Sequence, residues 1–149
     1  MTEFLETTVD KFIFRVATDR YYNEEGVWAK AEGERVRIGL SDFLQQSSGD
    51  VAFAEVEPEG TALKFGDEVA VIETIKVDVA LSSPISGTVL QVNPAMEDAP
   101  EAINQDPYGG GWLALIEASD WEVERSKLLD PEAYFDHMKL EAEEEIKKQ

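Results

Sequence analysis

The chain has 149 residues, 43% of them hydrophobic and 30% charged, which is enough for one domain with its own core. It has no cysteine, which excludes disulfides, thiolate metal sites and cysteine nucleophiles. It has one histidine, His137, and no G-x-S-x-G motif supports a serine hydrolase. The formal net charge of −19 repels nucleic acid and anionic lipid. Such acidity either steers docking onto basic partner surfaces or simply keeps the protein soluble.

The N-terminal residues indicate the compartment. The segment MTEFLETTVDKFIF is acidic and lacks the basic and apolar regions of a secretory signal, and no apolar run in the chain approaches a membrane span. We therefore expect a cytoplasmic monomer that contacts neither membrane nor nucleic acid. We expect His137 on a helix face at the surface rather than in a catalytic site.

The first third of the chain has the pattern of short strands and one helix. Alternating apolar residues predict a strand in KFIFRV, residues 11–16. Two apolar runs separated by Glu-Gly-Glu predict a hairpin over about 27–40. Ser41 as a possible N-cap and Gly49 as a stop predict a short helix between them.

Further strands follow this helix. Alternation in DVAFAEV predicts a strand with Val51, Phe53 and Glu55 on one face. The run VAVIET predicts another strand, and two more are expected around Pro84 and Gly87. Short strands separated by turns predict an all-β barrel or sandwich.

The last third of the chain is predicted to be a long loop followed by helices. Residues 93–112 contain three prolines and three consecutive glycines, which is typical of a loop. Ser119 and Glu122 have the spacing of a capping box, and Asp130 followed by Pro131 predicts the start of a terminal helix. Two glutamate–lysine pairs at i,i+4 are expected on its final turns: Glu143 with Lys147 and Glu144 with Lys148.

Lys76 is the unusual residue within VAVIETIKVDVALSSPISGTVLQV. A lysine in a β run is often an edge-strand residue that discourages aggregation, and no Asn-Gly or Asp-Gly marks a hairpin turn here. Yet it is the only lysine between Lys64 and Lys127, with Glu73 three residues before it and a turn at 84–89 after it. A covalent carrier needs one primary amine at the exposed apex of a rigid β-turn. The pattern alone leaves both interpretations open.

The surrounding sequence resembles the glycine cleavage system H-protein family over roughly residues 22–135. That family reads E-S-V-K-A, then S-P-x-S-G-x-V-x-x-x-N, then P-x-x-[IL]-N-x-[DS]-P-Y-G-x-G-W, preceded by V-G-I-T-x-x-A-x-x-x-L-G-D-[IV]-x-x-V-x-L-P-x-x-G. The matching residues are Gly39, Gly49, Asp50, Val56, Pro58, Gly60, Glu73, Lys76, Ser83, Pro84, Ser86, Gly87, Val89, Asn93, Pro100, Ile103, Asn104, Asp106, Pro107, Tyr108, Gly109, Gly111 and Trp112.

The resemblance implies a fold and a cofactor. The fold is a mainly β barrel-sandwich hybrid of the lipoyl and biotinyl carrier type, with a short internal helix and C-terminal helices. We expect a lead-in over 1–21 that packs on the domain, a carrier domain over 22–120 and a helical segment over 121–149. The resemblance also implies lipoic acid in amide linkage to Lys76, with Glu73 contributing to recognition of the attachment site.

The resemblance implies a set of partners as well. A lipoate ligase or lipoyl transferase would modify the lysine. The arm would then accept a methylamine unit from glycine decarboxylase and present it to the aminomethyltransferase. Dihydrolipoamide dehydrogenase would reoxidise it. The protein would thus be a carrier and a substrate of these enzymes, not itself an enzyme.

Some positions depart from the family pattern and keep other functions open. The departures are Gly26, Val27 and Trp28 in place of His-Glu-Trp, Ile75 and Val77 beside the lysine, Val79 in place of serine, and Ser82 in place of an aromatic residue. One alternative is a lipoate-binding protein that carries sulfur intermediates between sulfur-oxidation enzymes of a heterodisulfide-reductase-like pathway. Another is a non-lipoylated interaction module. Biotin carriers usually flank the lysine with methionines, which are absent here.

Overall fold

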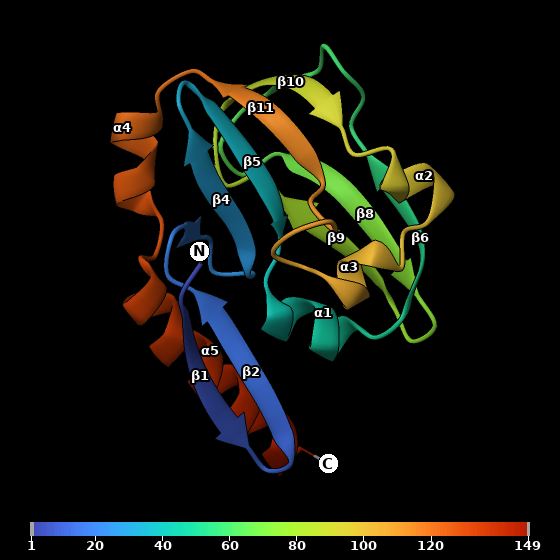
Figure 1. Cartoon of the computed structure of the whole chain (residues 1–149), viewed down its shortest axis with the longest axis vertical. Helices are drawn as coiled ribbons and strands as arrows, with labels where there is room; N and C mark the ends of the chain where they lie inside the picture. The colour runs from blue at the N-terminus through green and yellow to red at the C-terminus, as the bar shows by residue number, and fades with distance from the viewer. Residues whose placement is uncertain (1, 149) are drawn as a thin grey trace.

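Two antiparallel sheets form the body of the protein in the computed structural model, which describes residues 2–148 (Figure 1). The mainly β prediction is confirmed. The larger sheet has six strands in the order β3 (Tyr21–Tyr22), β4 (Val27–Glu32), β5 (Arg35–Leu40), β11 (Ala114–Ala118), β10 (Gly87–Val92) and β7 (Ala62–Leu63). The smaller sheet has three strands in the order β6 (Val51–Val56), β8 (Glu68–Thr74) and β9 (Asp78–Ser82).

The main core contains side chains from both sheets. Ile38 and Ile116 from the larger sheet and Ile72 and Leu81 from the smaller one are almost completely buried in one cluster. Burial of one such side chain contributes about 1.5–3 kcal/mol relative to exposure. The core therefore gives β8 and β9 a rigid base at the point where they lead into the turn around Lys76.

Strand β6 departs from the predicted alternation. The register against β8 shifts between Val51 and Phe53, so β6 has one extra residue there. Val51 is buried whereas Phe53 is 65% exposed. The prediction that these two side chains share a face is therefore wrong, because a β-bulge reverses the side to which later residues point.

The short helices are partly as predicted. Helix α1 (Asp42–Ser48) begins after Ser41, whose hydroxyl accepts a hydrogen bond from the Leu44 amide at 3.2 Å, as expected of an N-cap. The predicted long loop over 93–112 instead contains α2 (Ala95–Asp98) and α3 (Ala102–Gln105). Each buries one apolar side chain, Met96 and Ile103, against the main core. Tertiary packing thus makes helical turns where prolines and glycines predicted a loop.

The C-terminal region is helical, with different caps from those predicted. Helix α4 (Trp121–Glu124) begins after Asp120 without a side-chain cap, so the capping box at Ser119 is wrong. The Ser119 amide instead donates to the Ser86 carbonyl at 3.0 Å. The short 3₁₀ helix η1 (Arg125–Lys127) follows. Asp130 caps α5 (Pro131–Lys147) as predicted.

The expected glutamate–lysine pairs at the end of α5 do not form within 4.0 Å. His137 and Glu141 on this helix are instead in contact, with Nε2 and Oε1 2.6 Å apart. His137 is half-buried on the surface of α5, and its Nε2 also lies 3.0 Å from the Glu24 carbonyl oxygen. The expected surface position of this histidine is confirmed.

A hairpin and the last helix form a separate layer at one end of the molecule. Strands β1 (Phe4–Val9) and β2 (Phe12–Ala17) pair antiparallel and lie against α5 (Figure 1). We call this β1–β2 hairpin together with α5 the terminal module. A second apolar cluster joins it to the body, and its largest members are Phe14, Tyr22, Trp28, Phe43, Tyr134 and Met138.

Candidate functional site at the lysine hairpin

Lys76 lies in the turn that joins β8 to β9. The side chain of Thr74 shapes this turn, because its hydroxyl oxygen accepts hydrogen bonds from the Lys76 amide at 3.2 Å and the Val77 amide at 3.0 Å. A backbone bond from the Thr74 amide to the Val77 carbonyl closes it at 2.9 Å. A threonine that bonds the backbone two and three residues later replaces the missing Asn-Gly signal. The sequence alone does not mark Thr74 as a turn residue, because threonine is also a common strand residue.

Hydrogen bonds to the end of α1 hold the turn in place. The Thr74 hydroxyl lies 2.7 Å from the Ser48 carbonyl oxygen, to which it can donate, and the Ile75 amide donates to the Asp50 carbonyl at 3.2 Å. Gly49 lies between these two acceptors and has a φ of +96°. Because two bonds from the start of the turn fasten it to one corner of the body, Lys76 is held in a defined place.

Asn104 on α3 holds that corner together. Its side-chain amide donates to the Gly49 carbonyl and to the Gln45 side chain, both at 3.0 Å, and its oxygen accepts from the Val51 amide at 2.9 Å. Asn104 thus acts on the lysine indirectly, by holding the corner of the body to which the lysine turn is bonded. The Ile-Asn pair of the P-x-x-[IL]-N motif was its only signal in the sequence.

The Lys76 side chain is exposed and lies over Gly49. A Cβ atom on Gly49 would lie 3.4 Å from the lysine Cδ and 3.5 Å from its Cε. Within residues 2–148 no carboxylate lies within 4.0 Å of its Nζ. Its neighbours Ile75 and Val77 are exposed apolar residues, at 76% and 48%. A free primary amine on a fixed turn is suited to acylation by a modifying enzyme.

The structure does not bring Glu73 and Lys76 together. Glu73 pairs with Asp78 across the hairpin and faces a groove also lined by Phe53 and Glu101. Lys76 faces the other way, toward α5. A modifying enzyme that recognises both residues would have to contact the hairpin from two sides.

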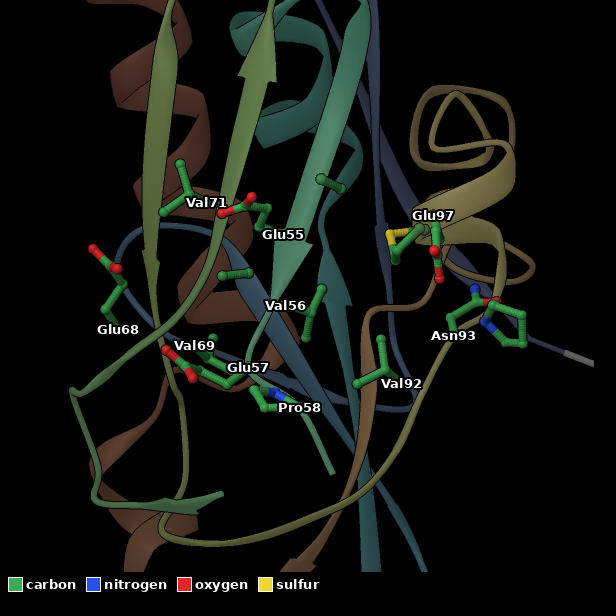
Figure 2. A pocket seen from close by; sticks show the side chains of 14 residues that line it. Glu55, Val56, Glu57, Pro58, Glu68, Val69, Val71, Val92, Asn93 and Glu97 are labelled. Atoms are coloured by element: carbon green, nitrogen blue, oxygen red, sulfur yellow. The ribbon is translucent and has the colours of Figure 1, made fainter. Parts of the chain in front are cut away.

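The groove beside Glu73 is acidic. Two adjoining hollows of about 520 and 610 Å³ share Ala54, Glu55, Val71, Met96 and Glu97. Figure 2 shows Glu55, Glu57 and Glu68 on the sheet side of the first hollow, with Glu97 on the other side. No lysine, arginine or histidine of the described chain lines either hollow. The groove therefore offers an apolar floor with a negative rim, and it runs along β6 and β8 from Glu68 to Glu73, beside the lysine turn.

Tyr134 explains why Gly26 stands where the family pattern has histidine. A Cβ atom on Gly26 would lie 2.7 Å from the Tyr134 hydroxyl and 2.8 Å from the Ser41 hydroxyl. Tyr134 stacks on Tyr22 with ring centroids 4.3 Å apart, and its hydroxyl lies 2.8 Å from that of Ser41. Burial raises the pKa of Tyr134, which keeps the phenol protonated. Helix α5 thus occupies the space that a side chain at position 26 would need.

The pKa of Glu145 on α5 depends on the charge of Lys76. Partial burial raises the pKa of Glu145, and the neighbouring carboxylate of Glu141 raises it further, whereas the positive charge of Lys76 lowers it. The lysine and the end of the terminal module are therefore electrostatically coupled.

No group of three or more histidine or acidic side chains within residues 2–148 is arranged to hold a metal ion. Across the same residues, no helix is long and apolar enough to cross a membrane. An exposed lysine at the tip of a β-hairpin in a double-sheet body is instead the arrangement of the lipoyl and biotinyl carrier class.

Comparison with known proteins identifies the family. The model of the family described as glycine cleavage H-protein matches residues 20–141. The chain is 39% identical over 125 residues to a probable glycine cleavage system H protein of Haloarcula marismortui, covering 84% of this chain and 98% of that one. It is 44% identical over 108 residues to the glycine cleavage system H protein of Stenotrophomonas maltophilia, covering 72% and 82%.

A solved structure agrees with these relatives. The glycine cleavage system H protein of Mycobacterium marinum superposes with a TM-score of 0.73 at 28% identity, covering 80% of this chain and 95% of that one. The chain belongs to the glycine cleavage H-protein family. Its function is that of a lipoyl carrier of the glycine cleavage system and not of a catalyst, and the predicted barrel-sandwich hybrid fold is confirmed. Members of this family are normally lipoylated.

Proposed function

We propose that Lys76 carries the lipoyl group and that the arm serves glycine decarboxylase, the aminomethyltransferase and dihydrolipoamide dehydrogenase in the cytoplasm. One observation supports this most: the amine of Lys76 is exposed, has no ion-pair partner within residues 2–148, and stands on a turn fixed by Thr74. Lipoate supplies the disulfide that accepts and releases the carried unit. The chain supplies the rigid mount.

Each residue around the turn has a separate task. Lys76 forms the amide through Nζ and loses its positive charge. Thr74 and the end of α1 keep the turn from folding away, so the arm pivots about a fixed point. The apolar flanks Ile75 and Val77 present a surface that a partner can cover when the arm enters its active site.

The acidic groove supports a role in docking. Glu55 and Glu97 both line it, and the whole chain has a net charge of −19. Complementary charge speeds the encounter of partners more than it tightens the complex, which suits a carrier that must leave each enzyme quickly. We therefore expect the partner enzymes to contact this groove with basic surfaces.

The test of the glycine cleavage role is exchange of labelled bicarbonate into glycine by glycine decarboxylase. We expect lipoylated wild-type protein to support exchange and Lys76→Arg to abolish it. Lys64→Arg, which changes another exposed lysine outside the β8–β9 hairpin, is the matched control and should retain full exchange. Absence of exchange with fully lipoylated wild-type protein would contradict the glycine cleavage role while leaving the carrier chemistry standing.

We also propose that Glu73 helps the lipoate ligase or lipoyl transferase to recognise the attachment site. Its exposed carboxylate lies on the hairpin itself, three residues before the lysine. The Glu73→Ala variant should be lipoylated more slowly, whereas Glu68→Ala, at the far end of the same strand, should not. Equal initial rates of lipoylation for Glu73→Ala and wild type would remove this role.

A further inference from the structure

The β1–β2 hairpin brings an aromatic side chain next to the lysine turn. Phe12, at the start of β2, lines a hollow of about 130 Å³ together with Lys76, and Ala142 and Ile146 of α5 line it as well. The positive charge of Lys76 also acts on the carboxylate of Glu145, near the end of α5. The end of the terminal module therefore lies beside the unmodified lysine.

Phe12 is exposed but held in a defined position. It is 39% exposed, and its ring stacks on that of Phe14 with centroids 6.3 Å apart. Phe14 in turn packs edge-on against Phe43 of α1, at 5.3 Å, within the second apolar cluster. The turn before Phe12 has only two residues, with Asp10 at a φ of +57°. A rigid aromatic side chain loses little conformational freedom when a partner covers it, which suits an interface anchor.

The lysine turn and Phe12 are close enough to belong to one interface. Ile75 and Val77, on either side of Lys76, are exposed apolar residues, and Phe12 and Lys76 line the same hollow. A standard protein interface covers about 800 Å² on each partner. A protein that covers the lysine turn on this side therefore also covers Phe12.

The partner that has to come closest to this surface is the enzyme that acylates Lys76. The amide forms at Nζ, so this enzyme brings its bond-forming atoms to the lysine amine itself, whereas enzymes that use the finished arm react with its far end. The lysine stem lies along Gly49, with its Cδ 3.4 Å from the place of a Cβ atom there, on the side of the hairpin that faces α5. The acylating enzyme therefore approaches from the side on which Phe12 lies.

Phe12 belongs to a part of the chain that the family match does not include. The match begins at residue 20, after β1 and β2 have ended. The relative from Haloarcula marismortui is covered to 98% by only 84% of this chain. The β1–β2 hairpin is thus an addition to the fold that these proteins share, placed beside the lysine turn.

We propose that Phe12, together with Ile75 and Val77, forms a contact surface for the enzyme that acylates Lys76. The inference rests on the proposed attachment of lipoate to Lys76. The three side chains offer neither charge nor hydrogen bonds, so the surface fits an apolar rim around the entrance to the enzyme's active site. The β1–β2 hairpin thereby raises the affinity of the unmodified chain for its modifying enzyme.

The test is the initial rate at which a lipoate ligase, supplied with lipoate and ATP, lipoylates the full-length unmodified protein at a series of protein concentrations. Phe12→Ser should raise the KM for the protein about tenfold with little change in kcat, as expected when one aromatic anchor is lost. Phe4→Ser is the matched control, because Phe4 is 40% exposed on the same hairpin but pairs with Ala17 at its opposite end. This control should retain the wild-type KM.

Two further measurements separate contact with the enzyme from a structural effect on the lysine. Acetylation of Lys76 by a small N-hydroxysuccinimide ester, followed by peptide mapping, should proceed at one rate in wild type and both variants, because a small reagent needs no contact with Phe12. The Lys76→Arg protein should inhibit lipoylation of the wild type competitively. Adding Phe12→Ser to it should raise its inhibition constant about tenfold, whereas adding Phe4→Ser should not.

The outcomes distinguish this inference from the function on which it rests. If the wild-type chain gains no lipoyl mass at Lys76, the proposed function fails and the contact surface falls with it. If Lys76 is lipoylated but Phe12→Ser has the wild-type KM, or the same KM as Phe4→Ser, only the contact surface is overturned. A parallel loss of reactivity toward the small ester in Phe12→Ser would also overturn it, because Phe12 would then act on the lysine and not on the enzyme.

Discussion

Gly49 lets the lysine side chain lie flat against the body. Its φ of +96° favours glycine, and the Lys76 methylenes lie at contact distance from the place that a Cβ atom would take there. The Gly49→Ala variant should lose about 1–3 kcal/mol of unfolding free energy, measured by denaturant titration, because its φ of +96° with a ψ of −172° is accessible almost only to glycine. It should also be lipoylated more slowly, because the new methyl group contacts the lysine stem.

Gly60 provides a matched control for this substitution. It has a similar φ of +89°, but no atom lies within 4 Å of the place that a Cβ atom would take there. Gly60→Ala should therefore show a comparable loss of stability with an unchanged rate of lipoylation. If both variants are lipoylated at the wild-type rate, the space over Gly49 does not matter to the arm.

Glu145 should report the modification of Lys76. The positive charge of the lysine lowers the pKa of Glu145 against the stronger effect of burial, which raises it. Lipoylation removes that charge, so the pKa of Glu145 should rise further. NMR titration of the Glu145 side-chain carbonyl carbon in unmodified and lipoylated protein measures the change. An unchanged pKa would show that the lysine does not act on this carboxylate.

At the scale of elements, α3 matters because it braces the corner on which the lysine turn stands. Asn104→Ala removes the hydrogen bonds to Gly49, Gln45 and the Val51 amide. The loss should be about 1–3 kcal/mol in unfolding free energy, because buried partners are left unsatisfied. Hydrogen exchange of the Ile75 amide, which bonds to the same corner, should accelerate.

The neighbouring residue gives a control for Asn104. Gln105 is exposed on the same short helix. Gln105→Ala should leave both stability and exchange unchanged within about 0.5 kcal/mol. A wild-type exchange rate for Ile75 in Asn104→Ala would mean that α3 does not support the turn.

Some of these elements could be predicted from the sequence and others could not. The β4–β5 hairpin, the Ser41 cap and the Asp130 cap follow from local turn and cap chemistry, which acts within a few residues. The bulge at Val51, the helices α2 and α3 and the approach of α5 to Lys76 depend on contacts distant in sequence. Lys76 itself was identified through its motif, whereas its turn depends on Thr74, a signal too general to stand out.

At the scale of the whole molecule, the charge distribution should govern association. If the acidic groove docks partners, the KM of glycine decarboxylase for the lipoylated protein should rise with ionic strength, because salt screens exposed charges. The double variant Glu55→Lys with Glu97→Lys should raise the KM at low salt and flatten its salt dependence.

A second double variant controls for net charge alone. Glu143→Lys with Glu144→Lys changes the formal charge by the same amount on exposed positions of α5. This variant should have a KM closer to that of the wild type. Equal effects of the two double variants would assign the salt dependence to overall charge rather than to the groove.

The central claim is that Lys76 is the attachment point of the arm. The most direct measurement is the intact mass of the chain after co-expression with a lipoate ligase, with peptide mapping of the modified residue. We predict the addition of one lipoyl group at Lys76 in the wild type and none in Lys76→Arg. A wild-type chain without added mass, or a Lys76→Arg chain modified to the same extent, would contradict the account.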